Sequence, residues 1–270
     1  MSAFIDSQEG VYFDLDEQTY RAATGINISA LKNINRSPAH YLAKLTEVRP
    51  EPTPALVFGT LLHRAALEPH KLGGSFAVKP EGMSFVSKEG KAWRDAQTLP
   101  IITEEQNIAL AGAAASVAAH PAAAAILADA KREVSVFRRI TRSNPEGLLL
   151  KGRLDIVATD SHGSTTIADI KTTEDASPEA FSKTIAQYGY AQQAAHYLDL
   201  LGATHFVFIA VEKTAPFAVG VYCLDPASVA MGRERNLRNL DLLESCQSSG
   251  HWPAYSSEIE TISLPAWASK

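Results

Sequence analysis

The sequence predicts an α/β or α+β fold with helices on both faces of a mixed central sheet. Three observations support this prediction. Helix signals dominate the first 130 residues, short β-branched runs follow between 133 and 173, and helix and strand signals then alternate up to about residue 247. This order of helices, three strands, helix, two strands and helix is typical of a layered domain rather than of an all-α or all-β one.

The helical first part is marked by two repeated start signals. Ser37-Pro38 and Thr53-Pro54 each place an N-cap residue before a proline at the first helical position. The second signal opens an apolar helix from Pro54 to Leu67. An alanine-rich tract from Thr103 to Ala130 predicts one or two helices, with a break near His120-Pro121.

The second part is built from strands and two helical segments. We expect strands at 133–141, 147–159, 164–173, 205–213 and 217–225, because each is a short run bounded by turn residues. Ser177-Pro178 opens a helix that ends near Gly202, with a break at Gly189, and a long helix runs from about Pro226 to Gln247. The tail from Trp252 to Trp267 is rich in aromatic residues and proline, and we expect it to pack across the domain.

Composition narrows the class of protein. The 270 residues are 46% hydrophobic and 20% charged, which supports a buried core and argues against wholesale disorder. The two cysteines exclude a disulfide framework and a four-cysteine zinc or iron–sulfur site. The N-terminus lacks the pattern of a secretory signal, and the apolar tract from Ile108 to Ala130 is too interrupted for a membrane span. We therefore expect a cytoplasmic protein with no membrane partner.

Charge is distributed unevenly along the chain. The net charge of −5 argues against a surface coated with nucleic acid. Residues 131–153 nevertheless carry seven basic and two acidic side chains, a local charge of +5. This basic stretch is either a solvated strand edge or part of a binding surface.

The strands around Asp155 and Asp169 carry the clearest chemical pattern. A three-residue loop centred on His162 places these two carboxylates directly opposite each other, with Cβ atoms roughly 4.5–5.5 Å apart. Two carboxylates that close repel unless a positive charge lies between them, and Mg²⁺ prefers such oxygen ligands. Lys171 shares the face of Asp169, where it can orient water or neutralise charge on a phosphate. The alternative is an exposed hairpin with a surface Asp–Lys network.

Three further features bear on this choice, and each has a structural alternative. Glu133 begins the preceding strand and can supply a third carboxylate, or it is a surface residue. His63 follows Gly59 by one helical turn and is either a site residue or a core histidine. Gln193 and Tyr197 share a helix face with a second tyrosine, which suits a buried seam, but a glutamine there needs a polar partner.

These residues resemble the PD-(D/E)xK nuclease core, a restriction-endonuclease-like fold. The combination of GTLLHRAALEP, KGRLDIV, IADIKTT, the QYGYAQQAAHY helix and the WPAY…LPAW tail resembles the RecE-type (exonuclease VIII C-terminal) branch, which is related to the lambda-type recombination exonuclease. The resemblance covers about residues 10–267. It implies a single nuclease domain over 1–270, with a helical part at about 1–130, the core at about 131–247 and a packing tail at 248–270.

The resemblance also implies roles for particular residues. Asp155 and Asp169 would bind the metal together with the Ile170 carbonyl, and Lys171 would be the catalytic lysine. Glu133 and His63 would complete the metal and phosphate environment, and Gln193 would position the lysine or the nucleophile. The expected cofactor is Mg²⁺, with Mn²⁺ as a substitute. The residues expected to contact DNA are Arg36, Lys88, Lys91, Arg94, Arg138, Arg139, Arg142, Lys151, Arg153 and Tyr197.

The activity implied by the resemblance is 5′-to-3′ degradation of one strand of linear double-stranded DNA for phage-type recombination. It also implies a ring-shaped homo-oligomer, a trimer or tetramer, and a single-strand annealing protein as partner. A basic lumen inside an acidic ring accounts for the uneven charge. The alternatives are an endonuclease on the same core and a catalytically decayed DNA-binding module. An iron–sulfur nuclease of the RecB-like branch is excluded by the cysteine count.

Overall fold

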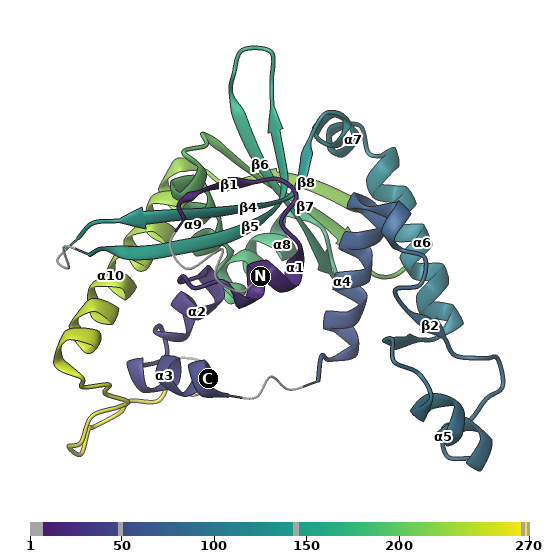
Figure 1. Cartoon of the computed structure of the whole chain (residues 1–270), viewed down its shortest axis with the longest axis horizontal. Coiled ribbons are helices and arrows are strands. Elements are labelled where there is room, and N and C mark those ends of the chain that lie inside the picture. Colours follow the sequence, from purple (N-terminus) through teal and green to yellow (C-terminus); the bar gives the residue numbers. More distant parts are fainter. Residues whose placement is uncertain (1–7, 48–50, 143–145, 266–267, 269–270) are drawn as a thin grey trace.

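A six-stranded mixed sheet forms the centre of the computed structural model, which describes residues 8–47, 51–142, 146–265 and 268 (Figure 1). The sheet order is β1-β4-β5-β6-β7-β8, and only the β6–β7 pair is parallel. The strands are β1 (Gly10–Tyr12), β4 (Lys131–Ile140), β5 (Leu148–Thr159), β6 (Thr165–Thr173), β7 (His205–Glu212) and β8 (Val219–Cys223). The predicted mixed sheet flanked by helices is confirmed.

Four helices follow β1 in the chain: α1 (Glu17–Ala22), α2 (Ile28–Asn33), α3 (Pro38–Thr46) and the longer α4 (Pro54–Leu67). The start signals act as the sequence predicts. Ser37 Oγ accepts a hydrogen bond from the His40 amide, and Thr53 Oγ1 accepts one from the Leu56 amide. These bonds satisfy amide groups that have no partner inside their own helix.

Between α4 and the alanine-rich helices, the chain forms a small subregion whose secondary structure was not predicted from the sequence. It contains the 3₁₀ turn η1 (Pro69–Lys71), the two short strands β2 (Ala77–Val78) and β3 (Ile101–Ile102), which pair in parallel, and α5 (Lys88–Asp95). Figure 1 shows α5 at the end of the molecule farthest from the central sheet. Gly90 of α5 packs against the Ser84 carbonyl so closely that a Cβ atom would lie 2.0 Å from it.

The alanine-rich tract forms α6 (Glu104–Ala119) and α7 (Pro121–Ala128), and the predicted break at His120-Pro121 is confirmed. Within the part of the chain that the structure describes, no single helix is long and apolar enough to cross a membrane. The α6–α7 pair meets the length and composition criteria together, but its axis bends by 81°.

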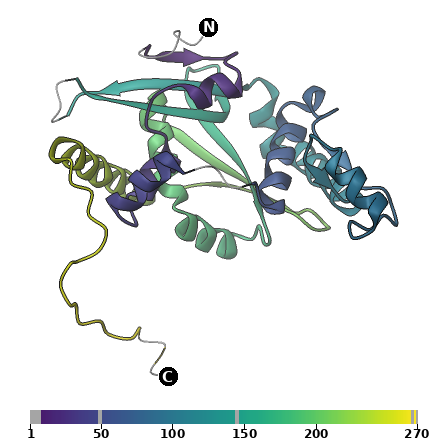
Figure 2. The ribbon, with the colours of Figure 1, turned by 60° about the horizontal axis from the view of Figure 1, so that its bottom comes forward.

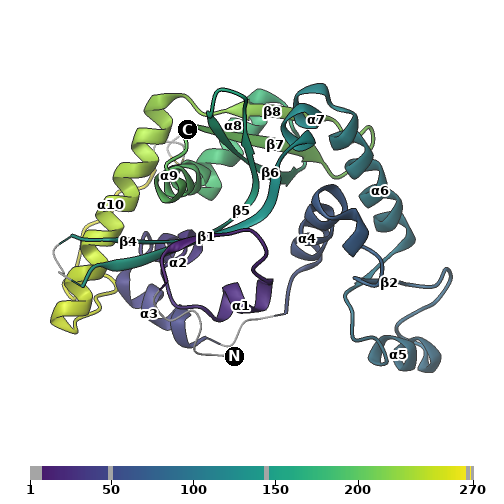
Figure 3. The same ribbon diagram turned by 45° about the horizontal axis from the view of Figure 1, so that its top comes forward.

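The remaining helices are α8 (Pro178–Tyr188), α9 (Tyr190–Leu201) and α10 (Pro226–Ser249). Gly189 separates α8 from α9 with a left-handed backbone conformation, at φ 62°, which glycine adopts without strain. Gly232 lets α10 lie close to α9, because a Cβ atom there would lie 2.2 Å from the Ala191 carbonyl oxygen. Figures 2 and 3 show α9 and α10 on one side of the sheet and α4, α6 and α7 on the other.

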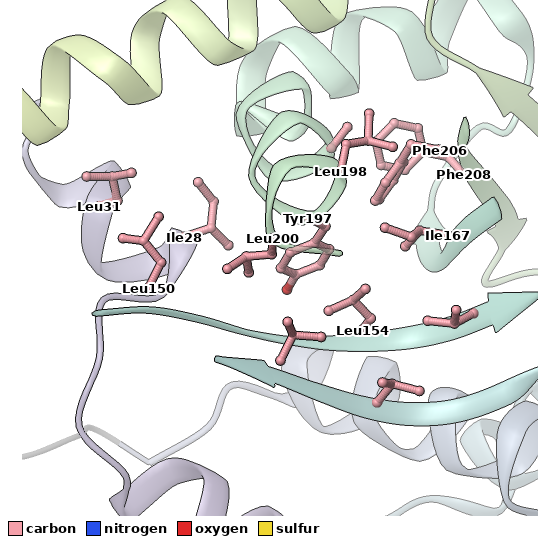
Figure 4. Close-up of a cluster of buried hydrophobic side chains, with 14 of the residues drawn as sticks. Ile28, Leu31, Leu150, Leu154, Ile167, Tyr197, Leu198, Leu200, Phe206 and Phe208 are labelled. Atoms are coloured by element: carbon pink, nitrogen blue, oxygen red, sulfur yellow. The ribbon is translucent and has the colours of Figure 1, made fainter. Parts of the chain in front are cut away.

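Each face of the sheet has its own hydrophobic core. One core joins the sheet to α2, α9 and α10, and Figure 4 shows part of it, including Ile28, Leu154 and Phe208. The other joins the sheet to α4, α6 and α7, with Leu62 and Ile170 among its fully buried members. Both cores reach β6, so this strand is held from both sides.

The C-terminal tail differs from its prediction. Trp252 stacks on Tyr41 of α3 with ring centroids 5.8 Å apart, and the Pro253 carbonyl accepts a hydrogen bond from the Ala39 amide. Beyond this anchor the chain runs away from the body (Figure 2), and Ile259, Ile262 and Leu264 are more than four-fifths exposed. Tyr255 still contacts His40 of α3, with ring centroids 5.9 Å apart, so the expectation that the whole tail packs across the domain is wrong beyond Tyr255. Trp267 lies outside the described residues.

Candidate active site

The β5–β6 hairpin brings Asp155 and Asp169 to one place. The ladder pairs Thr159 with Thr165 and continues to Ile156 and Ala168, so the next residues along the strands are Asp155 and Asp169. This is the register that the His162 turn predicts. The ladder ends there, and the Ile170 amide donates instead to Asp155 Oδ2 over 3.2 Å. The site therefore lies where β5 separates from β6.

Asp169 is held by one side chain on each oxygen. Lys171 Nζ lies 2.5 Å from Oδ1, and Gln193 of α9 donates from Nε2 to Oδ2 over 2.6 Å. The carboxylate is almost fully buried, and Oδ1 has no partner with hydrogen-bond geometry despite its short contact with Lys171. Gln193 thus has the polar partner that its place on an apolar helix face requires.

The charged side chains of the site shift the pKa values of Asp155 and Asp169 in opposite directions. Burial and the neighbouring Asp155 raise the pKa of Asp169 above its ordinary value. Burial also opposes the charged form of Asp155 and of Lys171. For Asp155, His63, Lys171 and the Ile170 amide together outweigh burial and lower the pKa, and for Lys171 the two carboxylates together outweigh burial and raise the pKa. Divergent pKa values of this kind cluster at functional sites.

His63 bridges the two strands from the opposite side. Its Nδ1 lies 3.1 Å from Asp155 Oδ2, and its Nε2 lies 2.7 Å from the Ile170 carbonyl oxygen. Burial opposes the charged form of His63, but Asp155 and Asp169 together outweigh burial and raise the pKa of His63 to about 9. Both ring nitrogens then donate hydrogen bonds. A Cβ atom at Gly59, one turn earlier on α4, would lie 3.7 Å from Thr172 Oγ1, so α4 approaches β6 closely here.

Glu133 lies on the neighbouring strand, opposite Asp155 in the register of β4 and β5. The residues on either side pair normally, as Arg132 with Ile156 and Val134 with Leu154. Glu133 itself adopts φ 55° and is not paired. Its Oε2 lies 2.6 Å from Arg153 Nε, and burial, followed by Asp155, raises the pKa of Glu133. An uncommon backbone conformation of this kind is found at functional sites.

A cavity of about 1220 Å³ opens beside these residues. His63, Glu133, Arg153 and Asp155 line it together with residues from α1, α4 and η1. Its wall also carries five arginine and lysine residues that the sequence did not single out as site residues, Arg21, Arg64, Lys71, Lys131 and Arg132, together with the acidic Asp14, Asp16, Glu17 and Glu68. Arg64 could have been found from the sequence, because it directly follows His63. Lys71 of η1 could not, because only tertiary structure brings η1 to the site.

The oxygen donors of the site fit a hard divalent cation. Two carboxylates and one backbone carbonyl meet at the end of the ladder, and the buried Asp169 Oδ1 has the Lys171 ammonium 2.5 Å away, which a bound cation would have to displace. The Ile170 carbonyl is engaged by His63, so cation binding there requires this ring to give up its contact. Over the described ranges, no group of three or more His, Cys, Asp or Glu side chains forms a metal cluster.

Three residues expected to contact DNA have other roles in the structure. Lys151 is 4% exposed and donates from Nζ to the Tyr20 and Ala23 carbonyls. Tyr197 packs in the core among Leu154, Leu200 and Phe206 (Figure 4). Arg142 makes ion pairs with two carboxylates of α10, Asp241 and Glu244. Burial contradicts the expected DNA contact for Lys151 and Tyr197, whereas for the partly exposed Arg142 a role in DNA binding stays a prediction.

The other basic residues lie nearer to solvent. Arg153 lines the cavity but is held by Glu133, Ser135 and the Leu15 carbonyl. Arg138 and Arg139 are exposed and donate to the Asp199 and Glu146 carbonyls. Arg36 donates to the hydroxyl of Tyr255 in the tail. Lys88, Lys91 and Arg94 are exposed on α5, away from the central sheet. A role in DNA binding stays a prediction for these residues.

The strand order, the diverging hairpin and the Asp–Asp–Lys centre define a PD-(D/E)xK nuclease fold. A family model covers residues 27–265, and the chain therefore belongs to the family described as a PDDEXK-like domain of unknown function (DUF3799). The predicted resemblance to this superfamily is confirmed.

The solved structures include one with the same fold. It is a protein from Eubacterium rectale described as a "putative exonuclease", and it has a TM-score of 0.59 at 12% identity, covering 94% of this chain and 97% of that one. The structure of SSO0001 covers 78% of this chain and 84% of its own at 17% identity. Its TM-score of 0.29 is too low to indicate a shared fold. The comparison with curated proteins gives no match.

Proposed function

We propose that this chain is a metal-dependent exodeoxyribonuclease that degrades one strand of linear double-stranded DNA from its 5′ end. The observation that carries the proposal is the group formed by Asp155, Asp169 and Lys171 where β5 and β6 separate. The nuclease fold and the neighbour described as an exonuclease support the reaction class. The 5′-to-3′ direction and the duplex substrate rest on the resemblance to RecE-type nucleases.

The cofactor we propose is Mg²⁺, with Mn²⁺ as a substitute. Asp155, Asp169 and the Ile170 carbonyl would hold it, and when bound it supplies Lewis-acid polarisation of the phosphate. His63 and Glu133 lie at the edge of this ligand set and are proposed to shape the charge around it.

The side chains of the protein supply the remaining steps. Lys171 keeps its proton because two carboxylates surround it, so it can orient the attacking water and neutralise charge that develops on the phosphate. Gln193 fixes the orientation of Asp169 through its hydrogen bond to Oδ2. The cavity wall carries both basic and acidic side chains, and its Arg64 and Lys131 are the groups we propose to contact the sugar–phosphate backbone of a DNA strand.

We further propose that the chain works as a ring-shaped trimer or tetramer and hands its product to a single-strand annealing protein in phage-type recombination. The extended tail exposes Tyr255, Ile259, Ile262 and Leu264, and we propose that these side chains are covered when the subunits assemble. We expect this activity in the cytoplasm.

Digestion of labelled linear duplex tests the proposal. Release of a 5′ label as mononucleotide with Mg²⁺, no release with EDTA, and an intact closed circular plasmid are the expected results. Nicking of the circle would indicate an endonuclease instead. Binding of DNA without cleavage under Mg²⁺ or Mn²⁺ would indicate a decayed module.

A further inference from the structure

Lys32 of α2 lies beside the catalytic group, although it is far from it in the sequence. Its Nζ donates a hydrogen bond to the Tyr188 carbonyl over 2.9 Å. The same nitrogen lies 5.6 Å from the centre of the Tyr190 ring, and Lys171 Nζ lies 4.8 Å from the centre of that ring. One aromatic side chain therefore contacts both ammonium groups.

A network of side-chain amides fixes α2 against the helices behind the site. Asn35 donates to Gln192 Oε1 over 2.9 Å, and Asn239 of α10 donates to Asn35 Oδ1 and to the Leu31 carbonyl. Gln192 directly precedes Gln193, which holds Asp169. Lys32 is thus placed on an element whose position is tied to the catalytic centre, rather than on a free loop.

The charge of Lys32 is not neutralised by the protein. In the part of the chain that the structure describes, no carboxylate forms an ion pair with it. Burial and the nearby Lys171 lower the pKa of Lys32 to about 8, and the pull of Asp169 in the opposite direction is smaller. A half-buried cation beside another cation is unfavourable in the free protein, and a bound anion relieves this repulsion.

We propose that Lys32 is a phosphate-binding residue, and that it forms with Lys171 a two-cation site for a phosphate group of the nucleic-acid strand. This inference rests on the proposed function and adds a substrate contact from α2, on the side of the site where α9 lies. The Tyr188 carbonyl uses one of the three ammonium protons, so two remain for phosphate oxygens. Lys32 contributes charge to binding, whereas Lys171 contributes to the chemical step.

The test compares Lys32→Met and Lys32→Gln with Lys183→Met. Lys183 is an exposed lysine of α8 that pairs with Glu179, so its loss removes the same charge elsewhere. Affinity for a labelled linear duplex is measured in EDTA at several salt concentrations, alongside KM and kcat with Mg²⁺ and the melting temperature. Lys32→Arg is the variant that should restore binding.

Both neutral Lys32 variants should bind about 5- to 20-fold more weakly at low salt, and their salt slope should fall by about 0.9. KM should rise more than kcat falls, because the lost contact is made before the chemical step as well as during it. The melting temperature should stay equal or rise, because an unpaired cation has been removed; a structural lysine would lower it.

Wild-type affinity and salt slope in both neutral variants, or changes no larger than those of Lys183→Met, would overturn the inference while leaving the nuclease proposal intact. A wild-type protein that neither binds nor cuts DNA would overturn both. A drop in melting temperature with an unchanged salt slope would assign Lys32 a structural role and also reject the inference.

Discussion

Gln193 Nε2 donates to Asp169 Oδ2 over 2.6 Å, and this bond ties helix α9 to strand β6, which also carries Lys171. The bond has no substitute nearby, because Lys171 approaches the other oxygen of the same carboxylate. The orientation of Asp169 therefore depends on an amide from the opposite layer of the fold.

Gln193→Ala should reduce cleavage by about 10- to 100-fold at neutral pH, because a buried acceptor loses its donor. The loss should raise the already elevated pKa of Asp169 further. Since the ionised carboxylate is needed, the rise of activity with pH should move to higher pH. Gln97→Ala, whose amide contacts only the Trp93 carbonyl, is the control. An unchanged pH–rate profile would count against this role.

Lys171→Ala should retain duplex binding but lose about two to four orders of magnitude in turnover. The side chain acts on developing charge, whereas many phosphate contacts share the binding energy. Asp169→Ala should lose metal binding as well as activity, and bind DNA slightly better because a negative charge has gone. Turnover and affinity are measured side by side. Near-wild-type cleavage by Lys171→Ala would show that this lysine is not at the catalytic centre.

Mg²⁺ should raise the melting temperature of the wild-type protein, because a ligand that binds only the folded state stabilises it, by about 2.7 kcal/mol at a concentration of 100 Kd. Asp155→Asn should abolish this shift, since it removes one of the two carboxylates. Asp95→Asn, at an exposed carboxylate of α5, should keep it. A metal-induced shift that survives Asp155→Asn would place the cation elsewhere.

His196 should make folding less stable at mildly acidic pH. It is buried, its Nε2 lies 3.1 Å from the Lys151 carbonyl oxygen, and burial lowers its pKa to about 4. Between pH 4 and about 6.5 the unfolded chain binds more protons at this residue, so stability falls as pH drops through this window, by about 3 kcal/mol in all. Urea unfolding at several pH values should show a smaller loss for His196→Gln, and the exposed His162→Gln should match wild type.

Gly232→Ala should destabilise the protein by about 1–3 kcal/mol or more, although alanine favours helices. The new Cβ would lie 2.2 Å from the Ala191 carbonyl oxygen, and backbone atoms cannot move aside as a flexible side chain can. Gly73→Ala, where nothing lies within 4 Å of the new atom, should be nearly neutral. Equal stability of the two variants would argue against close packing of α9 on α10.

Local signals accounted for most of the fold. Caps such as Ser37 and Thr53, the break at Pro121 and the turn around His162 are set by neighbouring residues, and the structure has them where the sequence predicts. The β2–β3 pair was missed because each strand has only two residues and depends on a distant partner.

The residues of the candidate site likewise fall into those that local sequence predicts and those that only tertiary structure places. Asp155, Asp169 and Lys171 follow from strand register, and their meeting is visible in the sequence. Lys151 and Tyr197 were misplaced because their burial depends on distant segments, the first on the carbonyls near Tyr20 and the second on β5 and β7. Lys32 gave no local signal at all, since only the folding of α2 against α8 and α9 brings it to the site.

The turn at residues 160–164 lies at the far end of the hairpin from the point where the ladder stops, and Figure 1 shows this hairpin projecting from the sheet. Insertions there of an even number of residues, split equally between the two strands, would lengthen the hairpin and leave the pairing of Ile156 with Ala168 intact. A one-residue slip of the pairing would turn one carboxylate to the opposite face. The loop is therefore a suitable place to attach a fluorophore or an affinity handle without moving Asp155 or Asp169.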